Sequence, residues 1–113
     1  MADTDTEETT EDTEEEIISD SLVQTACGWL RISTGLRDDE IRQTAEACLT
    51  DLYNSGLSED AIDTDDAVIQ QAIKLYLKAQ IGYDADAERF AEAYRNLRDS
   101  LALSGDYNGD NDG

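Results

Sequence analysis

Residues 65–82 read DDAVIQQAIKLYLKAQIG. Apolar side chains recur every three or four positions along this stretch, which predicts an amphipathic helix from near Asp65 and Asp66 to Ile81. Its apolar arc is wide, as is typical of a helix that packs on more than one side. Gly82 is suited to end it. We therefore expect this segment to be the central helix of the core.

The same spacing predicts three further helices on either side of this segment. Asp20 is placed to cap the first of them, and Gly56 supplies the left-handed conformation that closes the second. The short connection at Gly82 makes the last two helices antiparallel. No stretch alternates with a period of two, so the predicted fold class is all-α, a small antiparallel bundle of about four helices with disordered acidic termini. The three further helices are expected over residues 21–32, 38–53 and 87–103, with a polar loop at 57–64.

Charge divides the chain into three parts. The 113 residues include 28 acidic and 8 basic side chains, a formal net charge of −20. Ten acidic residues and no basic one fall in residues 1–20, and three more acidic residues fall in residues 106–113, so the part between them carries −7. Runs of like charge with few apolar residues cannot offset the entropy cost of ordering. We expect a disordered acidic arm over residues 1–19, a helical domain over 20–105 and a flexible acidic tail over 106–113.

The composition argues against several classes of function. Acidic side chains outnumber basic ones more than threefold, so a surface that grips nucleic-acid phosphates is hard to build. The chain has no His, neither Cys27 nor Cys48 has an activating partner, and no Gly-rich phosphate loop is present. We therefore expect no catalytic, cofactor-binding or metal site, and two buried thiols. No apolar run has the length of a membrane span, and the acidic start is unlike a secretory signal.

Short motifs follow one another along the chain in a set order. In the first half they are WLRI at residues 29–32, DDE at 38–40 and Gly56; in the second half they are AIKLYLKAQIGYD at 72–84, ERF at 88–90, Tyr94 and LALSGDY at 101–107. Their order and spacing resemble the phage head–tail connector, or adaptor, proteins of the HK97 type. The resemblance covers residues 20–107 and does not reach the acidic arm.

This resemblance implies a structural virion protein without enzymatic activity or cofactor. Family members form a ring beneath the portal, typically dodecameric, which continues the DNA channel toward the tail. The implied partners are the portal protein above, a stopper or tail-completion protein below, and identical subunits on each side. The implied location is the neck of the virion, assembled in the host cytoplasm, without a membrane. We expect a channel face that is acidic or neutral, because a wall of Lys and Arg would hold the passing duplex rather than let it slide without specific binding.

Two sets of residues are expected to matter for this role. Arg89, Arg95 and Arg98 alternate with acidic residues along the predicted helix 87–103, so surface ion pairing is the alternative interpretation of these three arginines. Tyr107 lies in the polar segment 104–112, and we expect this segment to order on docking against the portal. The family-motif and core set is Trp29, Leu30, Ile32, Ala72, Tyr76, Gly82, Tyr83, Phe90, Tyr94, Leu97 and Leu101. The candidate subunit or portal contacts are Arg89, Arg95, Arg98 and Tyr107.

Two other functions remain open from the sequence. An acidic protein that imitates DNA and occupies a basic partner's groove would use the same charge excess, and it predicts carboxylates at phosphate-like spacing on the folded surface. An acyl carrier protein is suggested by Asp20-Ser21-Leu22 at a helix start, where Ser21 would carry the phosphopantetheine; a plain helix cap explains the same residues. Residues 106–113 begin like a calcium loop but lack the bidentate Glu that such a loop requires.

Overall fold

The structure is a computed structural model that describes residues 18–82 and 85–109. Within that part of the chain the all-α fold class is confirmed, with four long helices, one short helix and no strand. The helices are α2 (Asp20–Leu30), α3 (Asp38–Asn54), α4 (Ala67–Gln80), α5 (Ala87–Leu103) and α6 (Gly105–Asn108). The described residues do not include Tyr83. They also do not include the terminal stretches 1–17 and 110–113, which belong to the segments predicted to be disordered.

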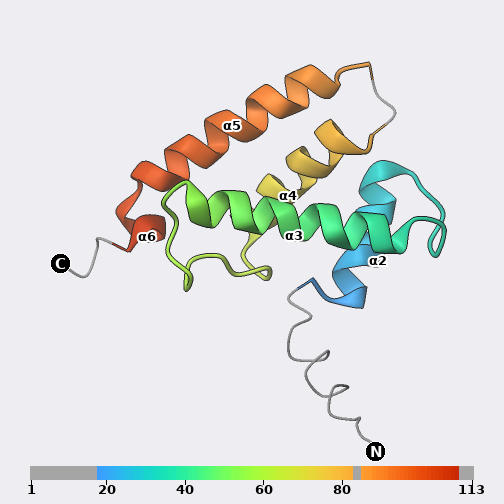
Figure 1. The fold of residues 1–113 in the computed structure, drawn as a ribbon, viewed down its shortest axis with the longest axis horizontal. Coiled ribbons are helices and arrows are strands. Elements are labelled where there is room, and N and C mark those ends of the chain that lie inside the picture. The colour runs from blue at the N-terminus through green and yellow to red at the C-terminus, as the bar shows by residue number, and fades with distance from the viewer. Residues whose placement is uncertain (1–17, 83–84, 110–113) are drawn as a thin grey trace, which may run out of the picture.

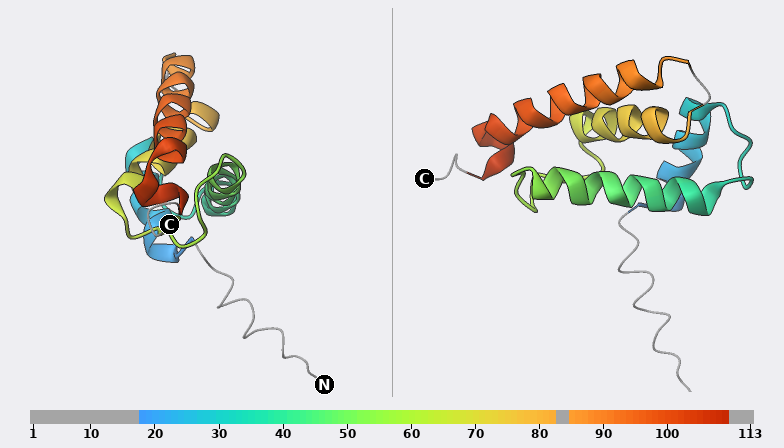
Figure 2. Two further views of the ribbon diagram at one scale, coloured as in Figure 1. Left: turned by 90° about the vertical axis from the view of Figure 1, so that its left-hand side faces the viewer. Right: turned by 45° about the horizontal axis from the view of Figure 1, so that its top comes forward.

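Helix α4 lies at the centre of the arrangement (Figure 1). It packs against α2, α3 and α5, and it runs antiparallel to α5 as predicted. By contrast, α5 is held mainly by α4 and α6 and forms one edge of the molecule (Figure 2). The molecule is flat, with extents of 48, 42 and 19 Å.

The core is formed where the apolar stripes of α2, α3 and α4 meet. The side chains of Ile41, Leu52, Ile69, Ile73 and Leu77 are all 0% exposed. Helix α5 adds two buried side chains at the edge of this cluster. Among the family-motif and core set, the buried residues are Leu30, Ile32, Ala72, Tyr94 and Leu101, whereas Trp29, Tyr76, Leu97 and Phe90 are half-buried.

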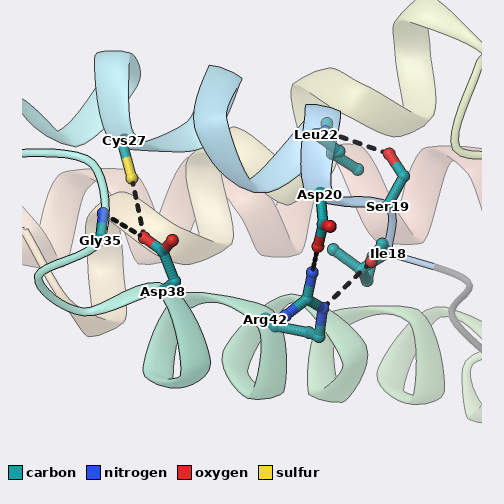
Figure 3. A network of polar contacts seen from close by, with 8 residues as sticks. All are labelled: Ile18, Ser19, Asp20, Leu22, Cys27, Gly35, Asp38 and Arg42. Carbon is teal, nitrogen blue, oxygen red and sulfur yellow. Dashed lines mark hydrogen bonds and ion pairs between the residues drawn. The ribbon is translucent and has the colours of Figure 1, made fainter. Parts of the chain in front are cut away.

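Helix α2 begins one residue earlier than predicted, because Ser19 and not Asp20 is its N-cap. The Ser19 hydroxyl oxygen accepts a hydrogen bond from the backbone N–H of Leu22 at 3.1 Å. Asp20 is the first helical residue, and its carboxylate pairs with Arg42 of α3, whose Nε donates to the carbonyl oxygen of Ile18 at 3.2 Å (Figure 3). Ile18 is 1% exposed. The folded domain therefore includes residues 18 and 19, which the sequence had assigned to the acidic arm.

Helix α2 also ends two residues before the predicted end at residue 32. Arg31 adopts the left-handed conformation, with φ 60° and ψ 43°, and the N–H of Ile32 donates to the carbonyl oxygen of Cys27 at 3.0 Å. This is the long hydrogen bond of a Schellman motif, after which an apolar residue packs back onto the helix. Ile32 fills that position and is buried. The apolar spacing continues through Ile32 although the helix does not, which explains the overlong prediction.

The short helix α6 lies where the sequence predicts a tail beginning at residue 106. Three hydrogen bonds tie it to the body. The N–H of Ser58 donates to the carbonyl oxygen of Tyr107 at 2.8 Å, and the side-chain amide of Asn108 donates to the carbonyl oxygen of Ala102 at 3.0 Å. The Tyr107 hydroxyl donates to Asp66 Oδ2 at 3.1 Å. The other oxygen of Asp66, Oδ1, caps α4 by accepting from the N–H of Val68 at 2.7 Å. The predicted boundary at residue 106 therefore falls inside the folded domain.

Leu52 and Leu103 offer a matched pair for testing the core, since they are 0% and 85% exposed. We expect Leu52→Ala to lower the free energy of unfolding by about 2–5 kcal/mol, because it removes packed atoms and leaves a cavity. The control Leu103→Ala is expected to change it by less than about 0.5 kcal/mol. Urea denaturation followed by circular dichroism measures both, and equal losses would contradict the packing described.

Gly28 and Gly82 are expected to respond to alanine in opposite directions. A Cβ at Gly28, inside α2, would meet nothing within 4 Å, whereas a Cβ at Gly82 would lie 2.6 Å from the carbonyl oxygen of Lys78. Gly28→Ala should therefore raise the melting temperature, since Gly in a helix costs roughly 0.5–1 kcal/mol relative to Ala. Gly82→Ala should lower it, because the backbone at the end of α4 must shift. A thermal melt in which both variants gain stability would show that the end of α4 is unconstrained.

Candidate functional site

The three candidate arginines of α5 have different surroundings. Arg98 pairs with Asp51 Oδ2 and with Asp99 Oδ1, each at 3.1 Å. Arg89 is 80% exposed and approaches Asp86 at 3.5 Å. Arg95 is exposed and makes no ion pair with any residue in the described ranges. Ion pairing thus accounts for two of the three arginines, whereas Arg95 pairs with no carboxylate that the structure describes.

Asp51 joins α3 to α5 through a single oxygen atom. Asp51 Oδ2 accepts a hydrogen bond from the Tyr94 hydroxyl at 2.7 Å in addition to the one from Arg98. The Tyr94 ring meets that of Tyr76 on α4 edge-on, with centroids 5.0 Å apart and planes at 67°. Arg98 also lies over the Tyr94 ring, 5.9 Å from its centre. These side chains connect α5 to α3 and α4 through directional contacts, where apolar burial is small.

Asp51 was not among the residues expected from the sequence to matter. The available signal was its place one residue before Leu52 and three after Cys48, which puts it beside the buried stripe of the predicted helix. An acidic residue there is normally solvated, and its partners Tyr94 and Arg98 lie 43 and 47 residues away along the chain. Such long-range pairing has no local pattern that a single sequence could reveal.

The groups around Asp51 are held in one protonation state near neutral pH. Burial raises the pKa of the Cys48 thiol to about 12. Burial also raises the pKa of Tyr94, and its hydrogen bond to Asp51 adds to this effect because ionisation would place two negative charges together. The hydrogen bond to Asp51 raises the pKa of Arg98. A general acid or base needs a pKa near the working pH, so the cluster is suited to structure rather than to proton transfer.

Both cysteines are buried, as predicted. Cys27 donates from Sγ to Asp38 Oδ1 at 3.6 Å, and the same oxygen accepts from the N–H of Gly35 at 2.9 Å (Figure 3). Burial raises the pKa of Cys27, and the contact with Asp38 adds to the increase. Asp38 thereby ties the end of α2 to the start of α3.

Two open hollows flank α5. One hollow of about 210 Å³ lies between α4 and α5 beside Asp51, and it shares Tyr76 and Gln80 with a hollow of about 390 Å³ between α3 and α4. A separate hollow of about 380 Å³ is lined by Arg89 and Phe90 of α5 and by Leu75 of α4. Because different faces of α5 line the two hollows, the helix has little cover on either side.

No group of three or more His, Cys, Asp or Glu side chains among the described residues is arranged to hold a metal ion. Within the same ranges, no helix combines the length and the apolar character that a membrane crossing needs.

Comparison with known proteins bears on the fold just described. Residues 23–108 match the phage connector protein family. The chain belongs to the phage connector protein family. The matched residues run from α2 to the last residue of α6, so they include nearly all of the folded domain and none of the acidic arm. Searches of curated proteins and of solved structures found no match for the connector.

Family membership gives the connector a structural role in the phage particle. It favours this role over the acyl-carrier alternative, which depended on Ser21. In the connector Ser21 is exposed in the first turn of α2, and its carbonyl oxygen accepts a hydrogen bond from the Thr25 hydroxyl at 3.1 Å.

The raised pKa of Cys48 predicts how the connector loses stability in alkali. A thiol whose pKa is about 12 in the folded state and near 9.0 when exposed contributes its full stability below pH 9.0 and loses it as the pH rises toward 12. The contribution of the Cys48 thiol to the free energy of unfolding falls by about 1.4 kcal/mol per pH unit in that range. We expect Cys48→Ala to show a shallower fall in unfolding free energy than the wild type between those pH values, measured by urea denaturation with reductant present. Parallel curves would show that the thiol is not protected by the fold.

Proposed function

We propose that this connector forms a dodecameric ring beneath the portal and continues the DNA channel toward the tail. The observation that carries the proposal is the family match over the folded domain, residues 23–108. The exposed α5 supports it, because this helix of 17 residues buries only Tyr94 and Leu101. A long helix with so little cover in the subunit has surface available for other subunits.

A closed ring of identical subunits needs two different, complementary faces on each subunit. Helix α5 supplies one edge of the molecule, and α2 with the turn before α3 lies at another (Figure 1). That turn carries Leu36, which is 69% exposed. We propose Arg89 and Arg95 as contacts with neighbouring subunits or with the portal. Arg98 and Tyr107 are bonded inside the subunit, so a role for them in assembly requires their release.

The proposed partners follow from the same position in the particle. The portal protein lies above the ring and a stopper or tail-completion protein lies below it, in the neck of a virion assembled in the host cytoplasm. The role proposed is mechanical, without catalysis or a cofactor. Each subunit would be held by its neighbours on both sides and by the proteins above and below.

Charge supports a channel that duplex DNA crosses without specific binding. The part of the chain between residues 20 and 106 carries −7, and repetition around a ring makes a strongly negative collar whose field extends for about 8 Å at physiological salt. A wall of this sign repels phosphates and leaves the duplex free to slide. We propose that the channel face is acidic or neutral.

Electron microscopy of the purified connector mixed with its portal protein tests both proposals. We expect rings stacked coaxially on the portal, and a three-dimensional reconstruction whose channel wall is acidic or neutral. Portal particles that remain bare at saturating connector would contradict the assembly proposal. A channel lined mainly by Arg31, Arg37, Arg42, Lys74 and Lys78 would contradict the second.

A further inference from the structure

We propose that the acidic arm of one subunit, residues 1–17, binds the lysine face of the α4–α5 hairpin on the next subunit. The lysine face consists of Lys74 and Lys78 on α4 with Arg89 and Phe90 on α5. The inference rests on the proposed ring and names a contact that joins its subunits. The partner is a second copy of this chain.

The α4–α5 hairpin is the part of the chain where acidic residues do not predominate. Residues 67–103 contain five acidic and five basic side chains, whereas residues 1–66 contain twenty acidic and three basic ones. Among the four long helices, α4 alone has no acidic residue. It carries both lysines of the chain, Lys74 and Lys78, one helical turn apart. The surface of α4 is therefore locally positive on a subunit of strongly negative charge.

The two lysines of this face have no acidic partner among the residues that the structure describes. No carboxylate in the described ranges forms an ion pair with Lys74 or Lys78. The Lys78 ammonium lies over the Phe90 ring, 5.2 Å from its centre, which is within the range of a cation–π contact. Phe90 and Arg89 also line the open hollow of about 380 Å³ beside α5, together with Glu92 and with Asp86, which pairs with Arg89. The face thus combines two lysines that pair with no described carboxylate with an accessible apolar surface.

The acidic arm is the segment with the complementary charge. Residues 1–17 carry nine acidic side chains and no basic one. Copies of a chain with a net charge of −20 repel one another, and assembly is favoured where opposite charges meet across the interface. A contact between the arm and the lysine face places the most acidic segment of the sequence against the least acidic helix.

The starting point and the length of the arm allow binding between subunits. The hydrogen bond from Arg42 Nε fixes Ile18 against α3 (Figure 3). In the view of Figure 1, the N-terminal end of α2 and helix α5 lie on opposite sides of α3. Seventeen residues span at most about 60 Å, and the longest extent of the subunit is 48 Å. An arm that leaves one side can therefore reach the opposite side of a neighbour, as a head-to-tail ring requires.

Zero-length carbodiimide coupling of the full chain tests the contact directly, since it joins a carboxylate only to an amine that touches it. Equal amounts of isotope-labelled and unlabelled protein are mixed, assembled on the portal and coupled, and the linked peptides are identified by mass spectrometry. We expect links from residues 3–16 to Lys74 or Lys78 that join a labelled chain to an unlabelled one. A synthetic peptide of residues 1–17 should compete with these links, and high salt should weaken them.

Charge-swap variants add a functional readout. We expect Lys74→Glu with Lys78→Glu to lower ring yield on the portal by roughly tenfold, the effect of losing several exposed ion pairs and gaining repulsion. Adding Glu14→Lys, Glu15→Lys and Glu16→Lys to the same chain should restore it. The matched control, Lys74→Arg with Lys78→Arg, should assemble like the wild type, because the charge is kept while the coupling amine is lost.

Three results would overturn the inference. Links confined to chains of one isotope would mean that the arm folds back on its own subunit. Rings that form equally well with the two glutamate substitutions would mean that the lysine face joins nothing. Duplex DNA retained by the wild type and lost in the glutamate variant, without links to the arm, would assign the face to DNA. Failure of the wild type to form any ring would contradict the proposed function instead, and binding of the synthetic arm to the chain would still test the inference.

Discussion

One carboxylate ties α5 to α3, in addition to the packing of α5 on α4 and α6. Asp51 accepts hydrogen bonds from both Tyr94 and Arg98 on the same oxygen, and the Tyr94 ring packs on Tyr76. Elsewhere the helices are held by broad apolar stripes, whereas α5 buries only two side chains. A hydrogen bond to an ionised group is roughly twice as strong as one between neutral groups. This arrangement thus adds a directional tie to α3 on a helix that leaves most of its surface available to partners.

The fold was predictable where the spacing of apolar residues along the sequence indicates a helix. The period of apolar residues over 67–80 and 87–103 marks α4 and α5, and α5 has the bounds that the spacing predicts. The ends of helices were less predictable where two capping residues stand side by side. Ser19 and Asp20 are both residues that commonly cap helices. Ser19 occupies the N-cap position of α2, where Ile18 is buried and Asp20 forms an ion pair with Arg42. The choice of Ser19 over Asp20 involves contacts with α3, which no local pattern contains.

The site was less predictable than the fold, for a related reason. Arginines on α5 are visible in the sequence, but whether each is paired depends on residues far along the chain. Arg98 forms an ion pair with Asp51, whereas Arg95 pairs with no described carboxylate, although the two arginines lie three residues apart on one helix. Tyr107 stands in a polar segment that resembles a tail, and its contacts with Ser58 and Asp66, far away along the chain, hold it in the fold. Long-range polar partners determine both outcomes.

The two oxygens of Asp66 make contacts with two different helices. Oδ1 accepts the N–H groups that begin α4, and Oδ2 accepts the Tyr107 hydroxyl of α6. Because separate oxygens make these contacts, the tyrosine does not compete with the backbone N–H groups for one acceptor. One carboxylate thereby couples the start of α4 to the C-terminal helix, so that a single substitution at Asp66 would disturb both.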